Sequence, residues 1–383
     1  MKIKLVHFTT DPNVGGGPKH IYHLAKNLDS QLFDSIVISP NGWLPRELNS
    51  QSASRRTNTK YFEYKTTNSI LSEVWELRKI FKKIKALDHP FSPIILHVHS
   101  PRSLYIASKA IIGLGVYLIY TEHIWTADYH TQSWWRDLLQ IAGIRQSLRS
   151  ASKVIAVSKS VANFLSSKKI IKKDKIEVIY PVLDQLVSHK KDTKKIGKGP
   201  LTERIIIGSV GAINYIKGYE YLVEAAKILK DRDIEFKIEI IGDGPQLDSI
   251  KQSIKDKNLS SVIKIVSKVA SENLDDYYRK WDIYVQPSLS ETFGLSVLAA
   301  LEHGLPVVAC RVGGLTEIIE NNHNGLLVPT KNPERLAEAL GELITNKKLY
   351  QKLASKAGET VDDNRFNGQD NLRKIEEIYK KLI

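Results

Sequence analysis

The residues best suited to chemistry lie in the string SLSETFGLSVLAALEHGLPVVA, residues 288–309. An apolar strand is expected to end just before it, and a helix is predicted from about Gly294 to Glu302, closed by Gly304 and Pro306. Four residues would open this helix at the carboxyl end of a strand, where free N–H groups and the helix dipole attract phosphate. They are Phe293, Gly294, Leu295 and Ser296.

Two further features could contact a ligand. Glu291 lies just before the predicted helix, where its carboxylate could accept hydrogen bonds from sugar hydroxyls; taken alone, it could equally be a solvated loop acid. Gly15, Gly16 and Gly17 follow the first predicted strand and precede a helix. Their spacing is not the G-x-G-x-x-G of a dinucleotide fold, which disfavours NAD.

Short apolar runs alternate with longer helical patterns along the whole chain. This rhythm predicts parallel sheets covered by helices on both faces, an α/β fold. The expected strands of the first half are Ile3–Phe8, Ser35–Ser39, Tyr61–Tyr64, Ile94–Val98, Tyr117–Thr121, Val154–Val157 and Ile176–Ile179. Those of the second half are Arg204–Val210, Lys237–Ile241, Ile263–Val266, Ile283–Val285, Pro306–Ala309 and Gly325–Val328.

The 383 residues are enough for two or three domains at ~150 residues each. Residues 188–200, SHKKDTKKIGKGP, are polar and basic and predict a linker. We therefore expect two doubly wound domains, 1–187 and 201–363, with an inter-domain cleft as the ligand site and residues 364–383 as a terminal helix that crosses back to the first domain.

The charge is concentrated in the first half of the chain. Lys and Arg outnumber Asp and Glu by 27 to 14 in residues 1–190, but only by 29 to 28 in residues 191–383. Such an excess suits an anionic partner, or simply a well-solvated surface. A single cysteine, Cys310, indicates a reducing compartment and is expected to be buried. No signal peptide and no run long enough to span a bilayer is expected.

Several motifs together resemble the retaining glycosyltransferases of family 4, which have the GT-B fold. The string around Glu291 resembles the family signature E-x-F-G-x-x-x-x-E, and the glycines at 15–17 match its N-terminal loop. The other matching strings, in chain order, are TEH at 121–123, VIAVS at 154–158, IEVIYPVLD at 176–184 with Pro181 in place of the usual Asn, GAINYIKG at 211–218, IGDGP at 241–245, VGGLTE at 312–317 and NGLLVP at 324–329.

Two positions depart from the family pattern. Ala299 stands where the family has a second Glu that holds the ribose, and Ala212 stands where an Arg helps to hold the diphosphate. Alanine can form neither contact. Glu302, one helical turn past Ala299, could serve the ribose in its place, and Lys217 remains for the diphosphate.

The resemblance implies sugar transfer from a nucleoside-diphosphate donor to a hydroxyl, with retention at the anomeric carbon. Lys217 and the N–H groups of residues 294–296 would stabilise the leaving diphosphate, while Gly16 and Gly17 would approach it from the first domain. His123 would contact the transferred sugar, unless it is a strand-end histidine satisfied by backbone, and Glu291 would hold sugar hydroxyls. Residues Val266–Lys268 lie where the family contacts the nucleobase. The sequence holds no His/Asp cluster with metal-ligand spacing, so we expect no metal and no cofactor.

The acceptor side is less defined. Residues 72–87 predict a basic amphipathic helix that could contact anionic lipid or simply cover its own sheet. Residues 124–137 hold three tryptophans and are the better candidate for acceptor or membrane contact. A second basic cluster comprises Lys168, Lys169, Lys172, Lys173 and Lys175.

We therefore expect a cytoplasmic, metal-independent, hexosyltransferase-like enzyme, peripheral on the inner membrane face and acting on a lipid-linked or surface-glycan acceptor in polysaccharide biosynthesis. A sugar-nucleotide epimerase is disfavoured by the motifs. A degenerate homologue that binds a sugar nucleotide or a partner without turnover remains an alternative because of Ala212 and Ala299. Nucleic-acid binding is not expected, since no reading module is present.

Overall fold

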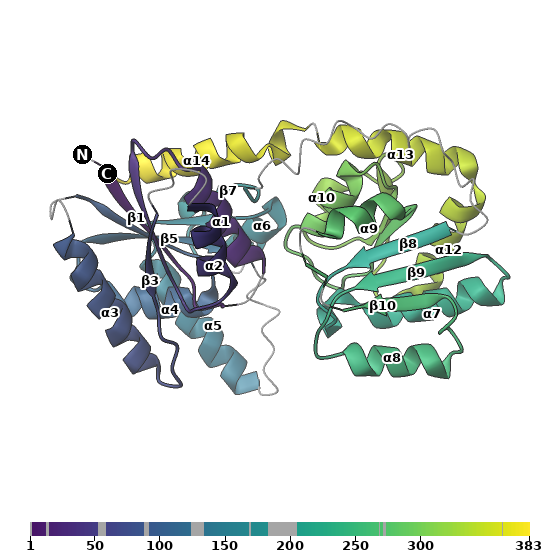
Figure 1. Cartoon of the computed structure of the whole chain (residues 1–383), viewed down its shortest axis with the longest axis horizontal. Coiled ribbons are helices and arrows are strands. Elements are labelled where there is room, and N and C mark those ends of the chain that lie inside the picture. Colours follow the sequence, from purple (N-terminus) through teal and green to yellow (C-terminus); the bar gives the residue numbers. More distant parts are fainter. Residues whose placement is uncertain are drawn as a thin grey trace. The chain divides into compact units, whose positions relative to one another are not determined.

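The computed structural model divides the chain into two compact units (Figure 1). The first comprises Met1–Gln185 with Arg365–Ile383, and the second comprises Leu186–Asn364. The residues that the structure describes are 2–12, 15–52, 59–87, 92–123, 134–167, 170–182, 205–267, 269–270, 273–361 and 363–383, with side chains omitted at 51–52, 134–141 and 361.

The first unit is built on a seven-stranded parallel sheet of order β3-β2-β1-β4-β5-β6-β7. Its central strands are apolar and buried almost throughout, as expected for strands covered on both faces. The strands are β1 (Ile3–Phe8), β2 (Phe33–Ser39), β3 (Lys60–Glu63), β4 (Ile94–Val98), β5 (Val116–Glu122), β6 (Lys153–Ala156) and β7 (Ile176–Val178).

Helices cover both faces of this sheet. Helices α3, α4 and α5 pack side by side on one face, and α1 packs with α2 on the other. The helices are α1 (Gly16–Asn27), α2 (Trp43–Ser52), α3 (Ile70–Ala86), α4 (Pro101–Ala110), α5 (Trp134–Arg149) and α6 (Lys159–Ser167), followed by the 3-10 turn η2 (Lys173–Lys175).

The last helix, α14 (Gly368–Lys381), belongs to the first unit although it ends the chain (Figure 1). Leu372, Ile375 and Tyr379 join the same buried cluster as Leu5 of β1. The Tyr379 hydroxyl also lies 2.7 Å from Nδ1 of His97 on β4. Apolar packing and one buried polar contact therefore fix this helix on the sheet.

The second unit has a six-stranded parallel sheet of order β10-β9-β8-β11-β12-β13. Helices α7 and α12 pack together against it and, with α8, supply much of its apolar core. The strands are β8 (Ile205–Val210), β9 (Phe236–Ile241), β10 (Ile263–Val266), β11 (Ile283–Gln286), β12 (Val307–Cys310) and β13 (Gly325–Val328). The helices are α7 (Tyr219–Asp231), α8 (Leu247–Asp256), α9 (Leu274–Lys280), α10 (Leu295–Glu302), α11 (Leu315–Ile318), α12 (Pro333–Thr345) and α13 (Lys347–Val361), with the 3-10 turns η3 (Tyr215–Lys217) and η5 (Asn364–Phe366).

The predicted α/β class, with two doubly wound parallel sheets, is confirmed, and no strand end differs from the expected one by more than two residues. Gly304 takes a left-handed conformation directly after α10, as its predicted role at the helix end requires. Cys310 is buried, as expected, and burial raises its pKa to about 12. Among the described residues, no helix is both long and apolar enough to cross a membrane.

Candidate functional site

In the second unit, the loops that follow β8 and β11 come together at the carboxyl edge of the sheet. Gly218 has φ +65°, and a Cβ on it would lie 2.2 Å from the carbonyl oxygen of Pro287. Glycine therefore allows the loop after β8 to pack directly on the loop after β11. The Leu289 N–H then donates to the carbonyl of Ile216 at 2.7 Å.

This packing brings Lys217 to Glu291. The Lys217 Nζ lies 2.5 Å from Oε2 of Glu291, and the two side chains are only 22% and 13% exposed. The two residues are 74 positions apart in the chain, so their pairing depends on the sheet order β8-β11. A partly buried ion pair at a strand edge presents both a cation for phosphate and an acceptor for hydroxyl groups.

The start of α10 lies beside this pair. Gly294 has φ +111°, and a Cβ on it would lie 2.5 Å from Cδ2 of Leu315, so a side chain would be strained there. The first bonds of the helix run from Val297 and Leu298 to the Gly294 carbonyl. The N–H groups of Leu295 and Ser296 precede those bonds and are suited to a negatively charged ligand.

A buried polar network holds the start of α10 on the end of β11. The side-chain oxygen of Gln286 accepts from the Tyr284 hydroxyl at 2.8 Å and from the Ser296 hydroxyl at 3.2 Å. The Gln286 amide nitrogen donates to the Ser288 hydroxyl at 2.7 Å. Because Gln286 is fully buried, these bonds fix the position of Ser296 relative to the strand.

The loop that contains Gly314 supports the turn from the other side. The Gly314 N–H donates to the Glu291 carbonyl at 3.0 Å, and a Cβ on Gly314 would lie 2.5 Å from the Phe293 Cα. Phe293 itself is buried, at 3% exposure. The motif at 312–317 thus acts as a brace for the turn that carries Glu291.

Val266 ends β10 at the same edge of the sheet. Its carbonyl accepts from the Gly242 N–H at 3.0 Å, and a Cβ on Gly242 would lie 1.9 Å from the carbonyl oxygen of Gly211, where the Lys217 loop begins. A continuous backbone surface therefore links Val266 to this loop. Lys268, which follows Val266 in the sequence interpretation, lies outside the described residues.

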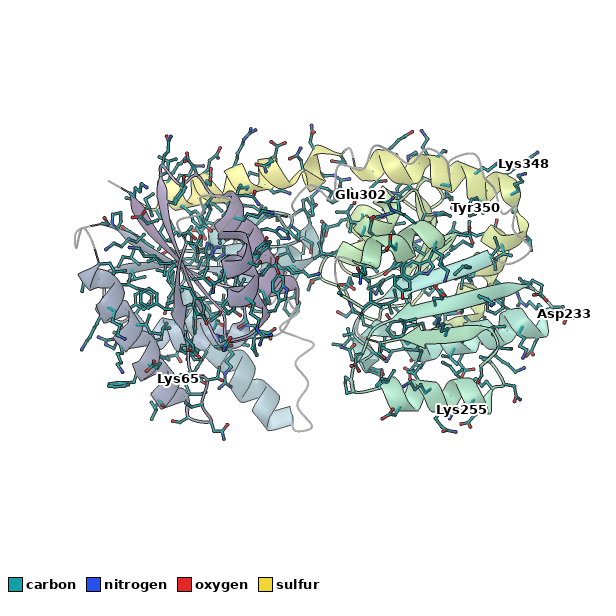
Figure 2. All side chains as sticks on the ribbon, in the orientation of Figure 1. Lys65, Asp233, Lys255, Glu302, Lys348 and Tyr350 are labelled. Carbon is teal, nitrogen blue, oxygen red and sulfur yellow. The ribbon has the colours of Figure 1, made fainter. Side chains whose placement is uncertain are left out.

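The two departures from the family pattern lie at accessible positions. Ala212 is exposed and Ala299 is partly buried. Glu302, which follows Ala299 by one turn on α10 (Figure 2), has its pKa raised from 4.5 to about 7 by burial and by the charge of Asp275. Asp275 itself accepts from His303 Nε2 at 2.5 Å and from the Arg279 guanidinium at 2.7 Å.

In the first unit, Gly16 and Gly17 open α1. A Cβ on Gly16 would meet nothing within 4 Å, whereas one on Gly17 would lie 3.3 Å from the His99 carbonyl oxygen and 3.9 Å from Cδ2 of His123. The structure therefore brings Gly17 and His123 together, two residues that the sequence analysis assigned to one ligand. Both belong to the carboxyl edge of the sheet.

Five histidines gather at this edge. We call them the histidine cluster: His7, His20, His97, His99 and His123. Their rings lie within contact of one another, with the centroids of His97 and His99 4.1 Å apart and those of His20 and His123 5.0 Å apart. Burial is the main factor that lowers the pKa of every one of them, to about 3 for His7 and about 4 for His123.

The sequence analysis found only one member of this cluster, His123. The sequence shows no His/Asp motif with metal-ligand spacing, yet two sets of three histidines lie close together in space among the described residues. The histidines come from β1, α1, the end of β4 and the residue after β5, and only His97 and His99 are close in the sequence, so sequence spacing does not reveal either complete set. The pairing of β1 with β4, which places His7 beside His97, is the signal that was missed.

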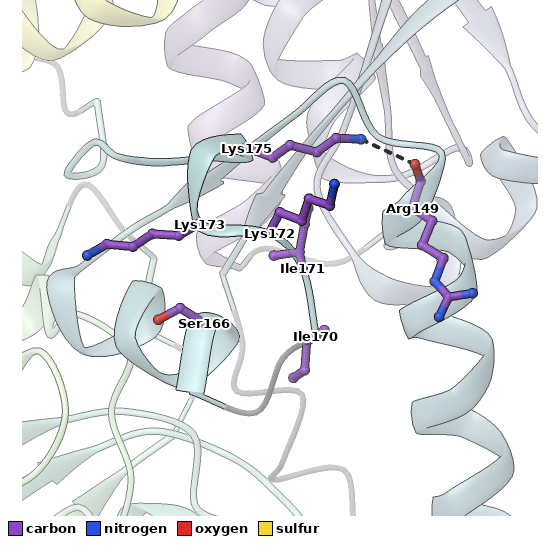
Figure 3. Close-up of a pocket in the computed structure, with 7 residues that line it drawn as sticks. All are labelled: Arg149, Ser166, Ile170, Ile171, Lys172, Lys173 and Lys175. Atoms are coloured by element: carbon purple, nitrogen blue, oxygen red, sulfur yellow. Dashed lines mark hydrogen bonds between the residues drawn. The ribbon is translucent and has the colours of Figure 1, made fainter.

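A basic pocket lies at the other edge of the first unit (Figure 3). Its volume is about 660 Å³. It is lined by Arg149, Ser166, Ile170, Ile171, Lys172, Lys173 and Lys175. Lys175 donates to the Ala151 carbonyl at 2.7 Å and to the Arg149 carbonyl at 3.3 Å, so it also helps to build the wall.

Two of the predicted acceptor-side features lie partly outside the described residues. Residues 124–133, which hold one of the three tryptophans, lie outside the described residues, and so do the side chains of Trp134 and Trp135. Lys168 and Lys169 also lie outside them, so only Lys172, Lys173 and Lys175 of the second basic cluster are described.

Two Rossmann-like units, each with its polar residues at the carboxyl edge of a parallel sheet, define the GT-B fold. A crystal structure of HepE from Anabaena in complex with UDP-glucose has the same fold, with a TM-score of 0.80 and 19% identity over 99% of this chain and 100% of that one.

Two family models match the sequence. The one described as "Glycosyltransferase Family 4" matches residues 14–185, and the one described as "Glycosyl transferases group 1" matches residues 190–360. The chain therefore belongs to glycosyltransferase family 4.

Curated relatives match over part of their length. An uncharacterized glycosyltransferase of Methanocaldococcus jannaschii is 30% identical over 233 residues, 61% of this chain and 60% of that protein. The N-acetyl-alpha-D-glucosaminyl L-malate synthase of Bacillus anthracis is 27% identical over 298 residues, 76% of this chain and 75% of that protein.

Proposed function

We propose that this protein is a retaining glycosyltransferase that moves a sugar from a nucleoside-diphosphate donor to a hydroxyl of a lipid-linked or surface-glycan acceptor. The observation that carries the proposal is the Lys217–Glu291 pair, 2.5 Å apart, at the start of α10. The family of the chain supports the reaction class, and HepE, which has the same fold, has been crystallised with UDP-glucose.

The chemistry follows from the charges at this site. The bond between the anomeric carbon and the diphosphate breaks, so negative charge grows on the leaving diphosphate. Lys217 and the N–H groups of Leu295 and Ser296 are suited to stabilise that charge. The acceptor oxygen forms the new bond on the same face of the sugar, and its proton passes to the departing phosphate.

Two side chains are assigned to the sugar itself. Glu291 accepts hydrogen bonds from sugar hydroxyls once the diphosphate competes for Lys217. His123 donates or accepts at another hydroxyl in its neutral form, since burial keeps its pKa near 4. Gly16 and Gly17, which carry no side chains at the start of α1, allow close approach of the donor on the His123 side. No metal is assigned to the transfer step.

The basic pocket of the first unit supports an anionic group on the acceptor, held at the opposite edge of the sheet from His123 and not at the reacting hydroxyl. Among its described lining residues, four are cationic, namely Arg149, Lys172, Lys173 and Lys175, and none is acidic. A lipid-linked glycan carries a phosphate or diphosphate, which such a pocket favours electrostatically. An uncharged sugar acceptor would not need these groups.

Helix α3 supports a peripheral contact with an anionic membrane. Its residues Leu77, Ile80, Phe81 and Ile84 are buried, so one face covers the sheet as the sequence analysis allowed. The opposite side exposes Leu71 at 82% and Trp75 at 64%, and Lys79 lies 5.4 Å from the Trp75 ring. The exposed Lys82 and Lys83 add charge to this α3 surface patch. Exposed apolar groups with lysines fit the headgroup region of the cytoplasmic leaflet.

Vesicle sedimentation tests the membrane contact. Vesicles that contain phosphatidylglycerol should bind the wild type, and Trp75→Ala should weaken that binding severalfold, while Tyr117→Ala, at an exposed aromatic residue of the same unit, should not. Equal binding to neutral vesicles, or equal effects of the two substitutions, would contradict the contact.

A degenerate homologue that binds without turnover is the second candidate, because Ala212 and Ala299 stand where the family has charged residues. Release of nucleoside diphosphate from a panel of nucleotide sugars separates the two functions. The enzyme proposal predicts release with at least one donor and a large loss in Lys217→Ala. No release with any donor, even after Ala299→Glu, would favour the binding protein.

A further inference from the structure

The histidine cluster contains two sets of three residues with metal-ligand proximity. In the first set, the ligand atoms of His7, His97 and His99 all lie within 4.8 Å of one another, and in the second the same is true of His20, His99 and His123. Imidazole nitrogen is a preferred ligand of zinc and related divalent ions. The question is which set is available for a metal.

His97 is already used by the fold. Its Nδ1 lies 2.7 Å from the Tyr379 hydroxyl of α14 and its Nε2 lies 2.7 Å from the Thr121 hydroxyl. A metal at His97 would break one of these buried hydrogen bonds. By contrast, His20 is only 4% exposed, and neither of its ring nitrogens has a hydrogen-bond partner among the described residues. The availability of ligand atoms therefore favours the set that contains His20.

The spacing of the other two ligands fits a tetrahedral ion. Nδ1 of His99 lies 3.3 Å from Nε2 of His123. Two nitrogens bound to tetrahedral zinc at ~2.0–2.1 Å lie ~3.3 Å apart, so this pair needs little movement to bind. We propose that His20, His99 and His123 form a binding site for a divalent transition-metal ion of the zinc type, with a fourth position open to water or ligand.

Three further observations agree with this site. Burial lowers the pKa of all three imidazoles, so each is neutral near pH 7 and can ligate without losing a proton. The Nε2 of His99 lies 3.4 Å from Nδ1 of His7, so its N–H can donate there and orient the ring. His123 is only partly buried, so solvent reaches this side of the site and can supply a fourth ligand.

The site has a consequence for activity that rests on the proposed function. A metal on His123 withdraws that imidazole from the sugar, so zinc would inhibit transfer rather than support it. Metal binding itself does not depend on any transfer step, so failure of the activity proposal would leave the binding measurement intact.

Titration of the full-length protein with Co²⁺ tests the site directly. Tetrahedral Co²⁺ absorbs visible light far more strongly than the hydrated ion, so one equivalent should produce an intense visible band. Added Zn²⁺ should then displace the Co²⁺ and remove this band. His20→Gln should weaken binding by about 100-fold or more because it removes one of three ligands. A far-ultraviolet circular dichroism spectrum of each variant establishes that it folds.

Two other substitutions make the assignment specific. His323→Gln, in the second unit, should leave Co²⁺ binding unchanged, and so should His97→Gln if that variant folds. The proposal is overturned if no tetrahedral spectrum appears with the wild type, or if His20→Gln binds Co²⁺ as the wild type does. Loss of binding in His97→Gln with retention in His20→Gln would assign the metal to the other three histidines and would equally overturn it.

Discussion

Glu302 offers a test of the electrostatics around α10. Its carboxyl group has a pKa raised from 4.5 to about 7, first by burial and then by the nearby charge of Asp275. The folded protein therefore binds a proton between these two pH values that the unfolded chain does not. The free energy of unfolding therefore falls as pH rises through this window. Above about pH 7 it stays lowered by the full cost of burying the ionised carboxylate.

Glu302→Gln removes that cost without changing the shape of the side chain. A pKa raised from 4.5 to about 7 corresponds to about 3 kcal/mol for a fully insulated group, and because water reaches part of this side chain we expect about half, ~1.5 kcal/mol. The variant should match the wild type at pH 4 and unfold ~3–6 °C higher at pH 8.5.

Thermal unfolding followed by circular dichroism from pH 4 to pH 8.5 measures this difference. Glu342→Gln, at an exposed glutamate of α12, is the matched control and should shift the unfolding temperature little at any pH. An equal gain for Glu302→Gln at pH 4 and at pH 8.5, or no gain at pH 8.5, would refute the argument that burial and Asp275 destabilise the ionised carboxylate.

Two further predictions concern α10. Gly294→Ala should lower the free energy of unfolding by about 2–3 kcal/mol, because φ is +111° and the new Cβ would meet Leu315. Gly304→Ala, at φ +72° in open space, should lower it by only about 1 kcal/mol. Equal losses for the two variants in urea unfolding would contradict this reasoning. Ala299→Glu should tighten nucleoside-diphosphate binding about tenfold, because it restores a charge-assisted contact. The gain should be larger in the Glu302→Gln background, where the neighbouring carboxylate is absent. If calorimetry shows no gain in either background, this position does not contact the nucleotide.

Much of the fold can be predicted from the sequence because parallel strands are apolar on both faces. The runs at Ile94–Val98, Ile263–Val266 and Gly325–Val328 match the observed strands at both ends. The turn around Gly294 is equally clear, since glycine, the following apolar helix and Gly304 all agree locally. These features depend on neighbours in the chain, which a sequence shows directly.

The parts that could not be predicted depend on strand order. Lys217 meets Glu291 only because β8 lies beside β11, and His7 meets His97 only because β1 lies beside β4. The raised pKa of Glu302 likewise needs Asp275 from a different helix, α9. Periodicity and motif spacing do not contain this information. The sequence therefore shows the TEH motif at 121–123 but not the histidine cluster around His123.

The sequence shows His123 without its neighbours in space. On its own, it is expected either to contact the sugar or to be a strand-end histidine satisfied by backbone. In the structure its Nε2 lies 3.3 Å from the Nδ1 of His99, and its ring is stacked with that of His99. Any role of His123 is therefore coupled to its neighbours, and the metal proposal follows from that coupling.

The most direct test of the central claim is calorimetric titration with nucleoside diphosphates. ADP, GDP, UDP and TDP are first screened by thermal stabilisation, and the best ligand is titrated into the wild type, Lys217→Ala and Lys348→Ala, the last at an exposed lysine of α13 (Figure 2). We predict that Lys217→Ala weakens binding by about 10- to 100-fold and that Lys348→Ala leaves it unchanged. Binding that is equally tight in all three proteins would show that the diphosphate does not bind beside Lys217 and Glu291.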